Sequence, residues 1–237
     1  MIVWKSFGAS VIGPGHVATG QPNQDAWAAI HRLWGDGIVV SDGVGSRPFS
    51  QFGSRAACLA VPSAVRACLG GTRSRSALGQ RIVSHWLSLI APLEPRDCAA
   101  TCMFAFRVGG AVQFGMLGDG LAAVVKTDGS VVSLSEDKTE GFSNVTAALS
   151  PNVTEKDWRW MAFREEDCGA IILCTDGVSD DLKDADGFVR EFVGAHRELA
   201  VVSAARHAHE MLERWPAPSH QDDKTIACLV REEVADE

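Results

Sequence analysis

The chain has 237 residues, of which 46% are hydrophobic, and it carries a formal net charge of −8 with a pI of about 5.4. This composition can bury a large core, and no Pro/Gly/Ser-rich linker or charge block divides the sequence, so we expect a single domain over residues 1–237. The acidic balance argues against a general nucleic-acid-binding or anionic-membrane surface. We therefore expect neither nucleic acid nor membrane among its partners.

The cysteines and the N-terminus bear on the cellular compartment. There are seven cysteines, an odd number, with no C-x-x-C pair, and most lie inside apolar runs. That pattern is typical of reduced core thiols rather than of disulfides or a zinc site. The first residues lack the pattern of a secretory signal, and no apolar run reaches ~18 residues. We therefore expect a soluble, cytoplasmic protein.

The first ninety residues predict three strands followed by two helices. A turn-rich segment separates the first strand from the next two, and Gly35-Asp36-Gly37 reads as the hairpin turn that joins those two. The second helix has apolar residues at helical spacing. The predicted strands are residues 2–12, 26–33 and 37–41, and the predicted helices are residues 53–70 and 75–92.

The remainder predicts mostly strands, with one further helical region. Residues 135–155 are polar and irregular and are expected to form a loop over one side of the molecule. Residues 187–215 have apolar positions at helical spacing and predict one or two helices. The predicted strands are residues 99–108, 111–117, 121–126, 131–134, 158–163, 170–174 and 226–230.

The order of these elements predicts the fold class. Strands and helices occur in separate runs rather than in alternation, which favours an antiparallel α+β architecture over a doubly wound parallel sheet. Two stacked sheets with helices outside would satisfy this order.

Aspartates recur at the ends of the predicted strands. The chain has six Asp-Gly pairs, and taken singly most of them are expected to be turns, because Gly accepts positive φ. Five acids nevertheless lie at or beside strand boundaries: Asp25, Asp42, Asp119, Asp176 and Asp222. If they converge at one end of a sheet sandwich, their repulsion favours a bound divalent metal, because carboxylate oxygens suit Mg²⁺ and Mn²⁺.

Other residues near these acids allow less specific readings. The Gly-rich connection after Asp42 would let backbone approach a ligand closely, although an ordinary strand-to-helix loop has the same composition. Asp180 follows Asp176 by four residues and adds a carboxylate. His16 and His220 lie near two of the acids, but a lone histidine is more often structural. No Ser-His-Asp, H-E-x-x-H or P-loop pattern stands out in the sequence.

Five motifs in order resemble the protein phosphatase 2C family of metal-dependent serine/threonine phosphatases, in particular its small bacterial-type members. The resemblance spans about residues 16–231. The motifs are Asn23-Gln24-Asp25-Ala26, Val40-Ser41-Asp42-Gly43-Val44-Gly45, Gly118-Asp119-Gly120, Cys174-Thr175-Asp176-Gly177-Val178-Ser179-Asp180 and Asp222-Asp223-Lys224-Thr225.

The resemblance implies a four-layer α-β-β-α sandwich that holds two Mn²⁺ or Mg²⁺ ions at one edge of its sheets. Asp42 would bridge both ions, the Gly43 carbonyl would bind one, and Asp176 and Asp222 would complete the other. Asp25 would support the site directly or through water. By the same resemblance, a third, weaker ion would be held by Asp119 and Asp180.

Several positions depart from the family pattern. Gln24 stands where members often have Glu, and Gly20 stands where an arginine commonly binds the substrate phosphate. Val44 replaces a histidine that is a proposed general acid, and Gly120 departs from the usual Gly-Asp-Ser-Arg. Candidates to replace the arginine are Arg47, His16 and Arg55, although Arg47 is equally expected to be an ordinary loop residue.

The resemblance implies a phosphoprotein phosphatase that hydrolyses phosphoserine and phosphothreonine by attack of a metal-bridging water. Asp42, Asp176 and Asp25 would be its catalytic residues, and a phosphorylated protein, with a cognate Ser/Thr kinase, its expected partner. One alternative is a catalytically weak or inactive regulatory protein that keeps the fold, because the usual arginine and histidine are missing. A phosphatase of small phosphoesters is a further alternative.

Overall fold

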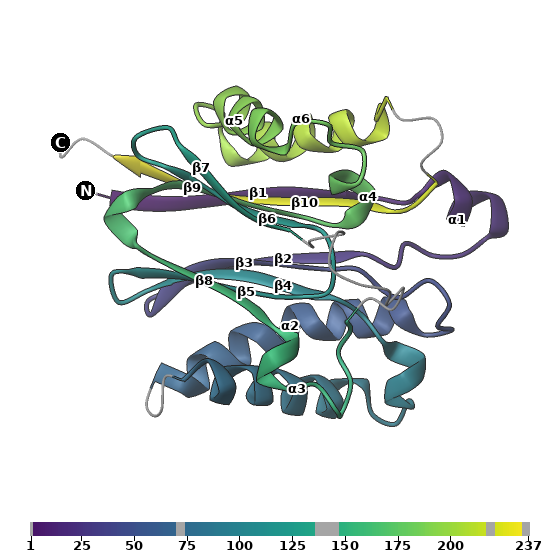
Figure 1. Cartoon of the computed structure of the whole chain (residues 1–237). Coiled ribbons are helices and arrows are strands. Elements are labelled where there is room, and N and C mark those ends of the chain that lie inside the picture. Colours follow the sequence, from purple (N-terminus) through teal and green to yellow (C-terminus); the bar gives the residue numbers. More distant parts are fainter. Residues whose placement is uncertain (1, 70–73, 136–146, 217–220, 234–237) are drawn as a thin grey trace.

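Two antiparallel five-stranded sheets are stacked face to face between two pairs of helices (Figure 1). The computed structural model describes residues 2–69, 74–135, 147–216 and 221–233. The predicted α+β class and the four-layer α-β-β-α sandwich are confirmed.

Within the described ranges no helix is long and apolar enough to cross a membrane, and all seven cysteines are buried and unpaired.

The upper sheet in Figure 1 joins the N-terminal strand to strands from the second half of the chain. Its order is β1-β10-β9-β6-β7. The C-terminal strand therefore lies between the first strand and the strand that carries Asp176 at its end. These strands are β1 Ile2–Val11, β6 Leu121–Lys126, β7 Val131–Ser135, β9 Cys168–Cys174 and β10 Lys224–Glu233.

The lower sheet has the order β2-β3-β4-β5-β8, so β2 is an edge strand. Residues of β3 are buried throughout, as expected for a strand covered by the other sheet on one face and by helices on the other. The strands are β2 Ala26–Arg32, β3 Gly35–Ser41, β4 Cys102–Val108, β5 Ala111–Leu117 and β8 Arg159–Arg164.

Three apolar clusters hold the layers together. One lies between the sheets, a second between the upper sheet and the helices above it, and a third between the lower sheet and the helices below it. Burying side chains on both sheet faces stabilises the stack, at ~25 cal/mol per Å² of apolar surface. The helices are α2 Ser50–Leu69 and α3 Arg75–Ile90 below, and α5 Ala185–His196 and α6 Val201–Glu213 above.

Three local predictions are corrected. The hairpin turn between β2 and β3 is Leu33-Trp34, whereas Asp36 lies within β3, where Arg107 and His31 bond its carboxylate. The segment predicted as turns contains a short helix, α1 Pro14–Thr19, which begins with a proline and ends at Gly20 with φ of 70°. Asp176 starts another short helix, α4 Asp176–Ser179, rather than a hairpin turn.

Some predictions fall on other parts of the chain. Residues 136–146 of the predicted loop, the predicted end of the first long helix at Gly70 and the side chain of His220 lie outside the described residues. Residues 147–154 form neither helix nor strand, in agreement with a loop.

Candidate metal centre

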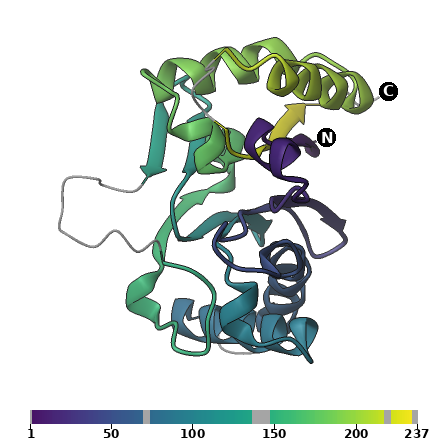
Figure 2. The ribbon, with the colours of Figure 1, turned by 90° about the vertical axis from the view of Figure 1, so that its right-hand side faces the viewer.

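Paired strands of the lower sheet bring two aspartates together. Asp25 immediately precedes β2 and Asp42 immediately follows β3, and these antiparallel strands are paired at Ala26 and Ser41. Because the start of one strand lies beside the end of the other, both carboxylates lie at the same end of the sheet. This end is on the right in Figure 1 and faces the viewer in Figure 2.

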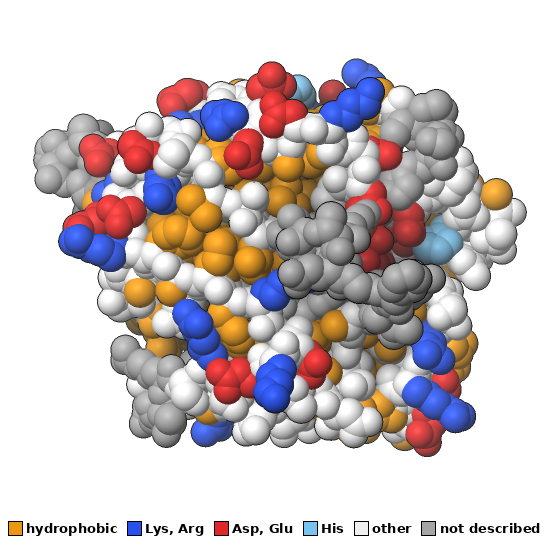
Figure 3. All heavy atoms as spheres, viewed as in Figure 1, with side chains coloured by type: hydrophobic (Ala, Val, Ile, Leu, Met, Phe, Trp, Pro, Cys, Tyr) orange, Lys and Arg blue, Asp and Glu red, His pale blue; other side chains and the backbone are white. Residues whose placement is uncertain are grey.

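The upper sheet supplies the other acids at the same end. Asp176 follows β9 and Asp222 precedes β10, and these strands are antiparallel neighbours. Asp119 lies in the turn before β6, which pairs with the end of β9, and Asp180 follows α4. Figure 3 shows acidic side chains gathered here beside a histidine.

Three of these carboxylates lie close enough to share an ion. Asp42, Asp119 and Asp176 each offer an oxygen, and these atoms lie within 4.8 Å of one another. The charges of Asp25 and Asp222 act on Asp42, and the charges of Asp222 and Asp180 act on Asp176. The structure thus brings the five strand-end aspartates and Asp180 together.

Burial and mutual repulsion disfavour the ionised forms of these acids. Burial raises the pKa of Asp25 to about 7, and the charge of Asp223 adds to the effect. Burial, followed by the charges of Asp25 and Asp176, raises the pKa of Asp42 well above its ordinary range. Burial and the carboxylate of Asp119 raise the pKa of Asp176 to about 6. A divalent cation would remove this penalty.

The hydrogen bonding of the cluster fits a hard metal ion. The Thr175 hydroxyl donates to Oδ2 of Asp25 at 2.9 Å. Oδ1 of Asp25 is buried and has no hydrogen-bond partner within the described ranges. A buried carboxylate oxygen without a partner is unfavourable, and sets of carboxylate oxygens are the ligands that Mg²⁺ and Mn²⁺ prefer.

The glycines of the two central Asp-Gly pairs are required by close packing. Neither Gly43 nor Gly177 has a positive φ, whereas Gly129 of the exposed hairpin has φ of 83°. A Cβ on Gly43 would lie 2.8 Å from the backbone carbon of Ser50, and a Cβ on Gly177 would lie 1.8 Å from the carbonyl oxygen of Asp223. Glycine therefore lets neighbouring backbone pack against the site.

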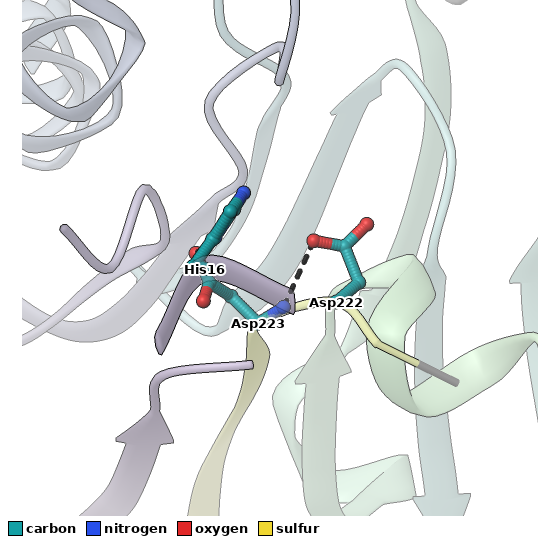
Figure 4. Close-up of side chains that lie close together, drawn as sticks. All are labelled: His16, Asp222 and Asp223. Carbon is teal, nitrogen blue, oxygen red and sulfur yellow. Dashed lines mark hydrogen bonds and ion pairs between the residues drawn. The ribbon is translucent and has the colours of Figure 1, made fainter. Parts of the chain in front are cut away.

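A second group of side chains borders the aspartates. Asp223 is almost completely buried, and its carboxylate accepts hydrogen bonds from the backbone N–H groups of Gly13 and Gln24, both at 2.6 Å. His16 Nδ1 lies 2.9 Å from the same carboxylate. Asp222 turns towards the backbone, where its Oδ1 accepts from the N–H of Asp223 at 2.8 Å (Figure 4). This network joins α1 to the start of β10.

Cationic side chains contact the backbone beside the cluster. The guanidinium of Arg159 donates to the carbonyl of Gly118, next to Asp119. The Lys224 ammonium donates to the carbonyl of Asp222 at 2.9 Å. Of the side chains proposed to replace the family arginine, His16 lies at the cluster beside Asp223, whereas Arg47 and Arg55 are exposed.

Comparison with known proteins identifies the family. The family model for protein phosphatase 2C matches residues 12–215, a range that contains all of the predicted motifs except the last. The chain belongs to the protein phosphatase 2C family. Membership places it with the metal-dependent protein serine/threonine phosphatases, as the motifs predicted. A search of curated protein sequences found no match.

Solved structures share the whole fold at low sequence identity. The catalytic domain of PstP, in complex with two manganese ions, has a TM-score of 0.65 at 18% identity, and the match covers 98% of this chain and 100% of that one. Stp1 from Staphylococcus aureus has a TM-score of 0.69 at 14% identity, with coverages of 98% and 96%. RsbX in complex with magnesium has a TM-score of 0.64 at 14% identity, with coverages of 98% and 100%.

The structure also contains a Ser-His-Asp chain of hydrogen bonds, a pattern that was not apparent in the sequence. Ser6 Oγ lies 2.7 Å from His31 Nε2, and His31 Nδ1 lies 2.8 Å from Asp36 Oδ1. Ser6 is only 6% exposed in the middle of β1, and Arg107 holds the other oxygen of Asp36. A substrate carbonyl cannot reach this hydroxyl, so the chain cross-links the two sheets and does not compete with the phosphatase 2C-type centre.

Sequence reasoning missed three residues at this phosphatase 2C-type centre. Asp223 belongs to the last motif but has no predicted role of its own, and its burial depends on contacts with Gly13, His16 and Gln24 from the other end of the chain. Thr175 and Arg159 gave no usable signal, because their contacts with Asp25 and Gly118 depend on residues far away in the chain.

Proposed function

We propose that this chain is a Mn²⁺- or Mg²⁺-dependent phosphoprotein phosphatase that hydrolyses phosphoserine and phosphothreonine. The observation that carries the proposal is the convergence of carboxylates from both sheets, in which Asp25 is buried and oxygens of the half-buried Asp42, Asp119 and Asp176 lie within 4.8 Å of one another. A protein that served only as a scaffold would have no need to bury mutually repelling charges.

The proposed metal ligands follow from the family motifs. Asp42, the Gly43 carbonyl, Asp176 and Asp222 would hold two ions, with Asp42 common to both. Asp25 would support them, directly or through water. Asp119 and Asp180 would hold a third, weaker ion. When bound, the ions lower the pKa of a water that they share and neutralise charge on the phosphoryl group.

The residues around the ligands hold them in place. The backbone of Asp42 is fixed on both sides by Thr101, whose Oγ1 accepts its N–H at 2.9 Å and whose N–H donates to its carbonyl at 2.7 Å. The N–H of Gly177 donates to Oδ1 of Asp176 at 2.7 Å. Such contacts reduce the rearrangement needed when an ion binds.

Because Gly20 replaces the arginine that commonly binds the substrate phosphate in the family, another cationic side chain would have to bind it. Arg159 and His16 are the two candidates that the contacts favour, because each bonds a group adjacent to a proposed ligand. In this scheme one of these two side chains contacts the substrate phosphate and stabilises its charge. Val44 offers no proton, so the leaving alkoxide takes its proton from another group or from water.

A catalytically weak regulatory protein is the second candidate function. It is favoured by the replacement of the phosphate-binding arginine by Gly20 and of the acidic histidine by Val44. Such a protein would retain the metal centre and bind phosphoprotein without rapid turnover.

Hydrolysis of p-nitrophenyl phosphate and of phosphothreonine peptides tests the proposal. We expect turnover by the wild type that requires Mn²⁺ and that Asp176→Ala reduces by a factor of 100 or more. The control is Asp128→Ala, in the exposed hairpin between β6 and β7. Activity that is independent of both Mn²⁺ and Asp176 would refute the mechanism, and bound metal without turnover on any phosphopeptide would favour the regulatory protein.

A further inference from the structure

Charge is distributed very unevenly between the helical layers. Residues 43–93, which include all of α2 and α3, contain six arginines and no Asp or Glu, although the chain as a whole has 30 acidic residues. Arg47, Arg55, Arg66, Arg75 and Arg81 are exposed. None of these five side chains forms an ion pair or hydrogen bond within the described ranges. The helical layer of α2 and α3 is therefore basic, although the protein as a whole is acidic.

Exposed apolar side chains lie between these arginines on one face of α2. Phe52, Arg55, Leu59 and Arg66 are spaced by three, four and seven residues, which places them along one side of a helix. Phe52 and Leu59 are 47% and 59% exposed. We call these four residues the docking face. It extends over ~21 Å, from Phe52 to Arg66.

A groove continues the docking face towards the edge of the lower sheet. Its volume is about 530 Å³, and it lies between β2 and the outer side of α2. Two arginines, Arg32 and Arg66, line it together with Leu59, Leu89 and Trp34, and no acidic residue is among its described lining. Ala28, Ala29 and Ile30 of the edge strand form its other wall.

The first turn of α2, at which the docking face starts, lies beside the proposed metal centre. The carbonyl of Gln24, the residue before Asp25, accepts a hydrogen bond from Ser54 Oγ of α2 at 2.5 Å, and Gly43 packs against Ser50. A chain bound at the aspartates could therefore continue along α2. The acid-free segment is preceded by Asp42 of the aspartate cluster and followed by Glu94 and Asp97, of which Asp97 is paired with Arg96.

We propose that the docking face and its groove bind an acidic segment of the phosphoprotein substrate, which carries an apolar residue for the groove. This inference rests on the proposed phosphatase function. A segment of six or seven extended residues would span the face, at ~3.3 Å per residue. Carboxylates of the segment meet the guanidinium groups of Arg55, Arg66 and Arg32, none of which forms an ion pair within the described ranges, although Arg32 donates to the His31 carbonyl. The backbone of the segment can pair with the edge strand β2. Exposed aromatic and aliphatic groups beside an edge strand favour a polypeptide over a nucleic acid or a lipid surface.

Matched phosphopeptides test the inference. The two peptides have the same phosphothreonine core. One carries an arm of Asp, Glu and Leu, and the other carries an arm of Ser and Gly. Each arm is tested both N-terminal and C-terminal to the core. We expect the acidic arm to lower KM about tenfold for the wild type, with kcat unchanged, and the advantage to shrink between 50 and 300 mM salt. Arg32→Glu/Arg66→Glu is expected to remove this advantage while leaving p-nitrophenyl phosphate turnover unchanged.

The matched control is Arg206→Glu, an exposed arginine on α6 in the opposite helical layer, which is expected to retain the preference. Equal KM values for the two arms in the wild type would overturn the inference, as would an equal loss in Arg206→Glu. Circular dichroism establishes that each variant is folded. The single variant Leu59→Ser tests the apolar part of the docking face independently, and we expect it to raise the KM for the peptide with the acidic arm about threefold.

A binding experiment separates failure of this inference from failure of the proposed function. Fluorescence anisotropy with the unphosphorylated acidic arm needs no turnover, so it tests the docking face even if no phosphopeptide is hydrolysed. We expect wild type to bind the arm at least tenfold more tightly than Arg32→Glu/Arg66→Glu does. The bound arm can also be displaced by competitors: unlabelled peptide, a single-stranded DNA 20-mer or phosphatidylserine vesicles. If the DNA or the vesicles displace the arm at a lower concentration than the unlabelled peptide does, the surface would be assigned to a different partner.

Discussion

Asp176→Asn is expected to stabilise the metal-free protein and to reduce strongly its stabilisation by Mn²⁺. Burial and nearby carboxylates raise the pKa of Asp176 from 3.8 to about 6. At ~1.4 kcal/mol per pH unit, the ionised carboxylate costs the folded state on the order of 3 kcal/mol at pH 7.5. Asparagine removes this charge, and its carbonyl oxygen can still accept from the N–H of Gly177.

The effect can be measured by thermal unfolding at pH 7.5, with EDTA and with excess Mn²⁺. For a chain of this length ~1 kcal/mol corresponds to ~2–4 °C, so we expect the metal-free variant to melt roughly 6–12 °C above wild type. Wild type is expected to gain ~2.7 kcal/mol when free Mn²⁺ is at 100 times its Kd, and the variant much less.

Asp128→Asn is the matched control, because Asp128 lies in an exposed hairpin and bonds Ser130. It is expected to show no such rise and to respond to Mn²⁺ as wild type does. A metal-free Asp176→Asn protein that melts below wild type, or that gains as much from Mn²⁺, would refute the electrostatic reasoning.

Three further predictions concern the same end of the molecule. An acid with a raised pKa in the folded state holds its proton more tightly there than in the unfolded state. The free energy of unfolding of metal-free wild type, measured by urea unfolding, should therefore fall as pH rises from about 4 to about 7. A rise in this free energy over the same window would contradict the raised pKa of Asp25. Gly177→Ala should lower the free energy of unfolding by ~3 kcal/mol or more, because its Cβ would meet the Asp223 carbonyl. Gly194→Ala in α5, where a Cβ has open space around it, should raise the free energy of unfolding by ~0.5–1 kcal/mol in the same assay. Equal effects of the two substitutions would contradict the packing argument. His16→Ala should leave the buried Asp223 carboxylate short of a partner and lower the melting temperature by several degrees, and an unchanged melting temperature would show that this contact contributes nothing.

The layers of the fold were predictable because hydrophobic spacing decides them. The long helices and all ten strands lie within a few residues of their predicted positions. The errors occur where a local signal has two meanings. Gly35-Asp36-Gly37 has turn composition, yet Asp36 stays in β3 because Arg107 and His31 hold its carboxylate. Those partners lie in other strands, and only the folded chain brings them together.

The site was predictable where it depends on strand ends and less so where it depends on packing. The spacing of Asp25, Asp42 and Asp176 relative to the strands, together with the family motifs, predicted that they meet. The burial of Asp223 and the contact of Arg159 with Gly118 arise from tertiary packing. Single-residue patterns hold no information about such contacts.

The most direct test of the central claim is anomalous diffraction from crystals grown with Mn²⁺. We predict two strong manganese peaks at the end of the sandwich, with a carboxylate of Asp42 bound to both and with Asp176 and Asp222 bound to one. A third, weaker peak is expected beside Asp119 and Asp180. The absence of manganese from this cluster in such crystals, or its presence only elsewhere on the protein, would contradict the account.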